Sequence, residues 1–314
     1  MKQTQFVNLN SQIWQQFQAY CELNSTFPED FPKLYRKICN DLAIARSRQY
    51  SPLLIQQLNQ LVQQGQKTLY LSRKNQFSEI WQIARTAFPR ALYENRFMLG
   101  ANLLAFWGLA VIAFIWVTLY PDAVYTFLGQ STVLEIEKMY NPTGAVQTEP
   151  RAPDKDILMF GVYIYNNIGI AFQMFAGGVL LCFGAVFFLL FNSFYFGAIG
   201  AHIVNVGFEK TFFSFVITHG SFELTAIIIA SAAGCQIGYA LLNPSQFTRS
   251  YAMKKAAQTA LPLIVGAFVM LVLAAFIEAF WSPRAIAHEI KFVVGTVCWT
   301  YVIYRLYRGM RYGT

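Results

Sequence analysis

The sequence predicts an all-α, polytopic membrane protein with about six membrane segments and an N-terminal cytosolic helical domain. Of its 314 residues, 55% are hydrophobic and only 13% are charged, about half of the roughly 25% typical of soluble domains. The mean hydropathy is +0.37. Residues 1–98 carry 12 Lys/Arg against 6 acids, whereas residues 121–156 carry 3 against 6. This composition argues against a soluble enzyme or a disordered scaffold, and the net charge of +8 reflects basic clusters between apolar runs.

Residues 1–98 are polar and rich in Gln, and apolar residues recur in them at helical spacing. The third such stripe begins after Ser51, a helix N-cap residue, and Pro52, which suits the first helical position. Three short amphipathic helices predict a small cytosolic bundle. The alternative is a dimerising coiled coil, but the stripes are too short for sustained heptads. A fourth segment, residues 78–88, leads to Pro89, where we expect the helix to kink or restart before the membrane.

The first membrane segment is predicted at residues 99–120, which carry no charge and are long enough for a hydrocarbon core of roughly 30 Å. Arg85, Arg90 and Arg96 precede it and predict a lipid-interface segment on the cytoplasmic side. Residues 121–156 then form an acidic extracytoplasmic loop, and we expect its stretch 142–153 to be mobile.

Five further membrane segments are predicted in the transmembrane domain, residues 99–314: about 157–191, 192–206, 212–242, 260–281 and 290–304. Residues 157–191 contain polar side chains and could form one tilted helix, or an interfacial helix followed by a span. The third segment, 192–206, is short and rich in small residues. A re-entrant or broken helix is therefore compatible with it, provided that protein shields its backbone.

The positions of the basic stretches favour an even number of membrane crossings, six. The basic stretch 249–255 and the basic tail 305–311 both favour the cytoplasmic side. They reach it only if residues 192–206 cross the membrane. The sequence thus predicts a membrane protein with both termini in the cytoplasm.

His219 and Glu223 are the most informative pair, because they lie four residues apart on one face of a predicted span. An ionisable residue within a span is by default a functional-site hypothesis. The pair could bind a divalent metal, relay protons, or form a neutral hydrogen-bonded pair near the outer end of the helix. The sequence does not decide among these three possibilities, and we predict no metal site.

Other polar residues within the spans complete a candidate intramembrane polar site: Asn166, Asn167, Asn192 and His202. His202 could pair with Glu223 or His219, because both ends of that connection face outside. Glu278, near the outer end of the fifth span, is expected to extend toward the surface. Close helix packing is the alternative explanation for the adjacent asparagines.

A helix-packing seam is predicted on the fourth span, where Ala230, Gly234 and Gly238 recur every four residues. Small residues at this spacing allow helix backbones to approach closely, within one chain or between copies.

No catalytic residue and no cofactor are predicted. The sequence has no GxSxG, HExxH or GxxxxGK[ST] motif, and its five cysteines show no CxxC pair. Basic residues in the N-terminal region are interspersed with acids and glutamines, so nucleic acid is not an expected partner. Membrane lipids are expected partners.

Four stretches resemble the stage II sporulation protein M family. Residues 86–106 contain its Phe-Pro and basic lead-in to the first span, and further similarity lies at 163–183 and 190–200. The resemblance is clearest at 219–238, HGSFELTAIIIASAAGCQIG, with the His-Gly and Glu-Leu series of the family. The similarity covers most of residues 86–242. Thr218 stands where a proline commonly precedes the His-Gly pair.

The resemblance implies a multi-spanning membrane protein without enzymatic activity. In spore formers the namesake anchors a complex with two peptidoglycan-degrading proteins that is required for engulfment, but wider members occur in bacteria that do not sporulate. The resemblance therefore implies a non-enzymatic protein of the bacterial cytoplasmic (inner) membrane. We expect it to assemble or anchor a membrane or cell-envelope complex, as a homo-oligomer or heteromer, with a cytosolic partner at residues 1–98. The alternative is a channel or transporter with a polar pathway near His219 and Glu223.

Overall fold

The computed structural model describes residues 2–22, 30–72, 83–144 and 152–313, and these ranges contain helices and no strand. Five helices are long and apolar enough to cross a membrane. The predicted all-α polytopic fold is therefore confirmed. The chain divides into two compact units, Met1–Glu79 and Ile80–Thr314.

The N-terminal unit contains α1 (Gln3–Glu22), α2 (Phe31–Ser47) and α3 (Pro52–Ser72). Its core is formed by aromatic and aliphatic residues at helical spacing, among them Phe6, Trp14, Phe17, Phe31, Ile38, Leu42 and Leu58. The Ser51 Oγ accepts a hydrogen bond of 3.4 Å from the backbone N–H of Leu54, so this serine caps the helix that begins at Pro52. The three apolar stripes thus pack on one another within one chain.

The segment before the membrane helices is described from residue 83 onward, and residues 78–82 lie outside the described ranges. A π-helical turn, η2 (Ile83–Ala87), leads into α5 (Phe88–Glu94), in which Pro89 is the second residue. Proline is tolerated in a first turn because the N–H that it lacks has no partner there.

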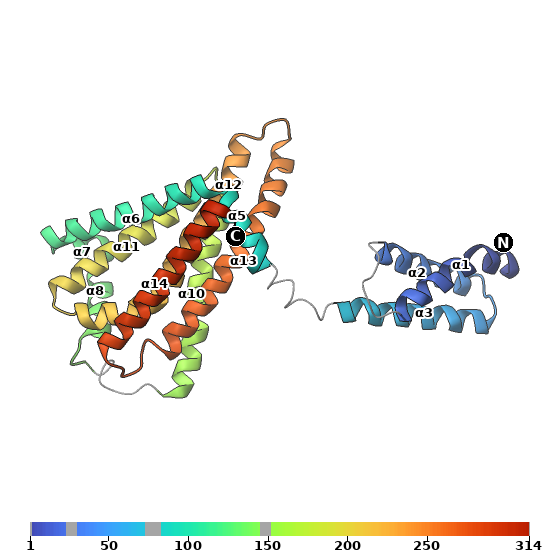
Figure 1. Ribbon diagram of the computed structural model, residues 1–314, viewed down its shortest axis with the longest axis horizontal. Coiled ribbons are helices and arrows are strands. Elements are labelled where there is room, and N and C mark those ends of the chain that lie inside the picture. Colours follow the sequence, from blue (N-terminus) through green and yellow to red (C-terminus); the bar gives the residue numbers. More distant parts are fainter. Residues whose placement is uncertain (1, 23–29, 73–82, 145–151, 314) are drawn as a thin grey trace. The chain divides into compact units, whose positions relative to one another are not determined.

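The membrane unit is built from α6 (Arg96–Leu119), α10 (Pro153–Gly177), α11 (Phe183–Asn205), α12 (Glu209–Leu242), α13 (Arg249–Phe280) and α14 (His288–Tyr312). In Figure 1, α6 and α11 run side by side, as do α12 and α13. The apolar stretch of α12 is 78% buried, compared with 17 to 39% in the other four candidate spans. The fourth predicted span is therefore the central helix of the bundle.

The predicted boundary between the second and third segments is wrong. Helix α10 ends at Gly177, and a turn leads to α11 at Phe183, so the third segment is a continuous helix of 23 residues rather than a short, re-entrant or broken one. Leu181 and Cys182 have positive φ angles of 55° and 74° in this turn. Apolar residues continue through the break, so hydropathy alone does not reveal it.

The turn after α10 packs tightly on α12. A Cβ added at Gly178 would meet the backbone of Gly234, and one added at Gly238 would meet Cys182. The predicted seam of Ala230, Gly234 and Gly238 is fully or nearly fully buried and lies against this turn. In this chain the small residues bring α12 close to α10 and α11.

The described part of the segment between α6 and α10 contains two short helices, α7 (Ala123–Leu128) and α8 (Gln130–Tyr140). Residues 145–151 lie outside the described ranges, so the expected mobility of 142–153 stays a prediction. Helix α8 packs on the bundle through Val133 and Tyr140, which are 1% and 9% exposed.

Helix α14 is less apolar than the five candidate spans, yet it packs on both α12 and α5. Near its start, Gly295 lies against Ile217 of α12, and near its end Gly309 lies against Leu92 of α5. The His288 Nδ1 atom lies 2.8 Å from the Ser214 Oγ atom of α12. The sixth predicted segment is thus a helix of 25 residues, and its crossing of the membrane stays a prediction.

Candidate functional site

A cavity of about 400 Å³ lies among α8, α10, α11, α12 and α13. Apolar side chains form most of its wall. Its polar lining brings together four residues that the sequence predicts for the site, and adds an acid from α13: Asn166, Asn192, His219, Glu223 and Glu278. This cavity is the candidate functional site.

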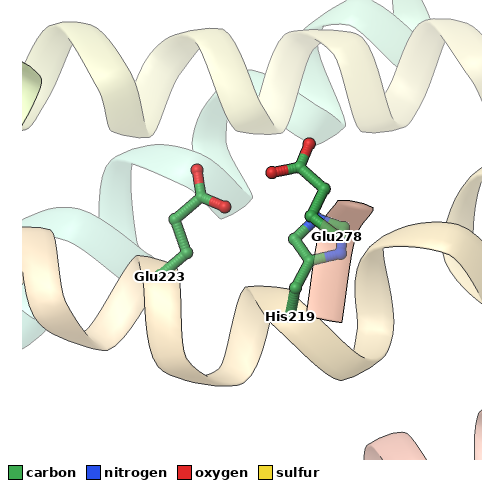
Figure 2. Close-up of side chains that lie close together, drawn as sticks. All are labelled: His219, Glu223 and Glu278. Atoms are coloured by element: carbon green, nitrogen blue, oxygen red, sulfur yellow. The ribbon is translucent and has the colours of Figure 1, made fainter. Parts of the chain in front are cut away.

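Three of these side chains converge. His219 and Glu223 project from the same face of α12, and Glu278 reaches them from α13 (Figure 2). One ligand atom from each, a ring nitrogen or a carboxylate oxygen, lies within 4.8 Å of the other two. The i, i+4 spacing places the first two residues together, and the packing of α13 on α12 supplies the third.

A hydrogen bond on the side away from the cavity orients the imidazole of His219. Its Nδ1 atom lies 3.0 Å from the Ser282 Oγ atom, in the turn that follows α13. The Lys291 Nζ donates a hydrogen bond of 2.8 Å to the Ser282 carbonyl oxygen. All three residues are buried, at 4%, 1% and 6% exposed. Since Ser282 engages Nδ1, the Nε2 atom is the ring nitrogen left for the cavity.

The adjacent asparagines of α10 have different surroundings. Asn166 lines the cavity and donates from Nδ2 to the Oδ1 of Asn167, at 3.1 Å. Asn167 is 3% exposed and lies beside Glu223. Its Nδ2 atom forms no hydrogen bond of good geometry with the other described residues. This amide is therefore a buried donor next to the carboxyl group of Glu223.

Tyr140 closes the cavity from α8, outside the long helices. Its ring packs edge-on against Phe212, with 4.9 Å between ring centroids. Burial raises the pKa of the Tyr140 phenol above its usual range, and the carboxyl groups of Glu278 and Glu223 add to this shift. The phenol thus stays protonated at neutral pH and can donate a hydrogen bond toward the acids.

His202 lies outside this cavity. Its Nε2 atom lies 2.7 Å from the Glu137 Oε1 atom of α8, so the pairing with His219 or Glu223 that the sequence allowed is not formed. Asn205, on the next turn of α11, donates to the Val117 carbonyl oxygen at 3.1 Å. Both residues fix neighbouring elements to α11.

The expectation for Glu278 is wrong, because the side chain turns inward to His219 rather than toward the surface. Sequence reasoning also missed Tyr140. One signal in the sequence could have identified Glu278. It lies near the outer end of its span, and His219 and Glu223 lie near the outer end of the preceding span, so the three residues are expected at a similar depth in the membrane.

The predicted lipid-interface arginines lie at and before the start of α6: Arg85 in η2, Arg90 in α5 and Arg96 as the first residue of α6. Arg85 and Arg90 are exposed, and Arg90 pairs with Glu94 at 3.0 Å. The Arg96 guanidinium lies 4.4 Å from the Tyr93 ring centroid. Arginines beside aromatic rings are typical of a membrane interface.

Chemically, the cavity offers an imidazole nitrogen, two carboxyl groups, amides and a phenol. No Lys or Arg is among the described residues that line it. His219, Glu223 and Glu278 are the residues that could hold a metal ion.

Comparison with known proteins adds a family match for the membrane unit and one similar protein. Residues 102–283, more than half of the chain, match the family model "Stage II sporulation protein M". The chain is also 28% identical over 130 residues to Uncharacterized protein MJ0793 of Methanocaldococcus jannaschii, which covers 40% of this chain and 71% of that protein.

The N-terminal unit is similar to a different model. Residues 4–71 match "Domain of unknown function (DUF8413)". No solved structure matches the chain. The family match spans α6 to the end of α13 and contains every polar residue of the cavity. The chain therefore belongs to the Stage II sporulation protein M family of membrane proteins.

Proposed function

We propose that this chain is a non-enzymatic protein of the bacterial inner membrane that assembles or anchors a membrane or cell-envelope complex. Both termini lie in the cytoplasm in this proposal, and the N-terminal unit binds a cytosolic partner. The observation that carries the proposal is the pairing of a membrane unit of this family with a separate helical unit that has its own core.

The N-terminal unit offers a surface for such a partner. A groove of about 540 Å³ lies between α1 and α3 and is lined by six glutamines and as many apolar residues, among them Trp14 and Leu53. Leu53 is 68% exposed. An exposed apolar side chain amid neutral amides suits a protein surface better than it suits a nucleic acid or an anionic lipid.

The transport alternative has less support. His202, one of the polar residues considered for a pathway, is engaged by Glu137 outside the cavity. The lack of GxSxG, HExxH and GxxxxGK[ST] motifs in the sequence supports the non-enzymatic part of the proposal.

The test compares two leucines of similar exposure. A photo-crosslinking amino acid at position 53 of the full chain, in intact cells, should capture one defined partner, and the same amino acid at Leu9, which is 69% exposed and outside the groove, should not. Leu53→Glu should release that partner, and Leu9→Glu should retain it. Equal capture from both positions would contradict the proposal.

A flux measurement separates the two functions. In liposomes, His219→Ala and Glu223→Gln should leave ion and solute flux at the level of protein-free vesicles, as should the unmodified chain. Flux that the unmodified chain supports and both variants abolish would favour the transport alternative.

A further inference from the structure

We propose that His219, Glu223 and Glu278 bind one divalent transition-metal ion inside the membrane unit. This inference goes beyond the assembly role, because it concerns a site within the bundle and not the N-terminal surface. It rests on the geometry of the three ligand atoms, the charge of the cavity, and the fixed orientation of the histidine.

The spacing is close to that of a metal site. Zinc and similar ions bind imidazole nitrogens and carboxylate oxygens at about 2.0–2.2 Å, which places tetrahedral ligand atoms roughly 3.4 Å apart. In this cavity the three atoms already lie within 4.8 Å of one another. Glutamate side chains have several rotatable bonds, so small rotations of Glu223 and Glu278 suffice to close the remaining gap.

The charge of the cavity favours a cation. Two carboxyl groups meet in a cavity whose described lining contains no Lys or Arg. Charged carboxylates in a low-dielectric interior need a counter-charge, and a dipositive ion balances two of them. Lys291 does not serve this purpose, because its Nζ atom binds the Ser282 carbonyl oxygen behind the histidine.

The surrounding contacts resemble those that orient metal ligands. A ligating histidine commonly uses its second ring nitrogen for a hydrogen bond, and Ser282 engages the Nδ1 atom of His219 at 3.0 Å. The amide of Asn167 is 3% exposed and lies beside Glu223, where it can donate to a ligating carboxylate. These contacts hold the ligands before any ion arrives.

The ligand set selects the class of ion. One imidazole with two carboxylates suits Zn²⁺, Mn²⁺, Fe²⁺ or Co²⁺, whereas Ca²⁺ and Mg²⁺ prefer oxygen ligands alone. A cavity of about 400 Å³ leaves space for water molecules to complete the coordination.

Cobalt is the probe for the test. The full chain, purified in nanodiscs and stripped with a chelator, should bind one Co²⁺ per chain with visible absorption bands, and Zn²⁺ should displace it. Glu278→Gln should weaken Co²⁺ binding at least about tenfold, since it removes a ligand. Glu137→Gln is the matched control, because it alters the other His–Glu pair of the bundle and should leave binding unchanged.

Either of two binding results would overturn the proposal: no Co²⁺ or Zn²⁺ binding at millimolar concentration, or equal affinity in the unmodified chain and Glu278→Gln. If Glu278→Gln fails to fold, Glu278→Asp retains the carboxylate on a shorter side chain and should bind with intermediate affinity. X-ray absorption of the Zn²⁺-loaded chain gives an independent readout. Nitrogen and oxygen ligands support the site, and a sulfur ligand from a cysteine contradicts it.

Discussion

The Nε2 atom of His202 lies 2.7 Å from the Oε1 atom of Glu137, and this pair joins α11, inside the bundle, to α8 in the segment after the first span. The His202 side chain is 5% exposed and that of Glu137 is 26% exposed. Glu137→Ala leaves a buried ring nitrogen without its partner, so we expect the free energy of unfolding to fall by about 1–3 kcal/mol. Thermal unfolding in detergent and hydrogen exchange of residues 123–140 measure the effect.

Glu135 supplies the control for that variant, because it lies on the same helix and is exposed. Glu135→Ala should change stability by no more than about 0.5 kcal/mol. Equal losses in the two variants would show that the His202–Glu137 pair does not hold α8 on the bundle.

The contact between Gly178 and Gly234 predicts a second effect. A Cβ at position 178, in the turn after α10, would overlap the backbone of Gly234, whereas one at Gly169, on α10, would meet nothing within 4 Å. We expect Gly178→Ala to lower the free energy of unfolding by about 1–3 kcal/mol, because the turn and α12 must move apart. Gly169→Ala should have little effect or stabilise by up to about 1 kcal/mol.

Unfolding midpoints of the two alanine variants, measured in the same detergent, test this prediction. A Gly178→Ala midpoint equal to that of Gly169→Ala would mean that the turn after α10 does not need close approach to α12.

A buried acid organises the N-terminal unit. Asp41 is 0% exposed and accepts hydrogen bonds from the Trp14 Nε1 atom at 3.0 Å and the Lys37 Nζ atom at 2.7 Å. Asp41→Ala leaves the indole N–H of Trp14 without this acceptor. We expect a loss of about 1–3 kcal/mol in the stability of this unit, read from hydrogen exchange of α1–α3 in the full chain.

The exposed pair of Asp30 and Lys33 gives the comparison for Asp41. Its side chains are 67% and 74% exposed, so Asp30→Ala should change the same exchange rates by no more than a surface substitution, about 0.5 kcal/mol or less. Faster exchange in Asp30→Ala than in Asp41→Ala would contradict the role assigned to the buried acid.

The predicted topology is tested by single cysteines in a background without the native ones. Ser131 on α8 and Ser250 on α13 are both exposed, and serine-to-cysteine changes are nearly isosteric. A membrane-impermeant maleimide added to intact cells should label Ser131→Cys and not Ser250→Cys. Labelling of Ser250→Cys from outside would overturn the six-segment arrangement with cytoplasmic termini.

Much of the fold could be predicted from composition and periodicity. A stretch without charge such as residues 99–120 can bury its side chains in lipid as a helix, and Ser51 with Pro52 marks a helix start by local hydrogen bonding and by the fixed φ of proline. The break at 178–182 escaped this reasoning. It depends on two residues with positive φ and on the contact of Gly178 with Gly234, 56 residues later, and neither alters the hydropathy.

Part of the candidate site could likewise be predicted from the sequence, and part depends on tertiary packing. The sequence by itself determined the membrane class, the family resemblance and the shared helix face of His219 and Glu223, because composition and the helical period act over short distances along the chain. Only the tertiary structure decided that Glu278 joins these two residues, that Tyr140 closes the cavity and that His202 pairs with Glu137 instead. Each of these contacts depends on how separate helices pack, and the fit between side chains 55 to 79 positions apart is not encoded in any local pattern.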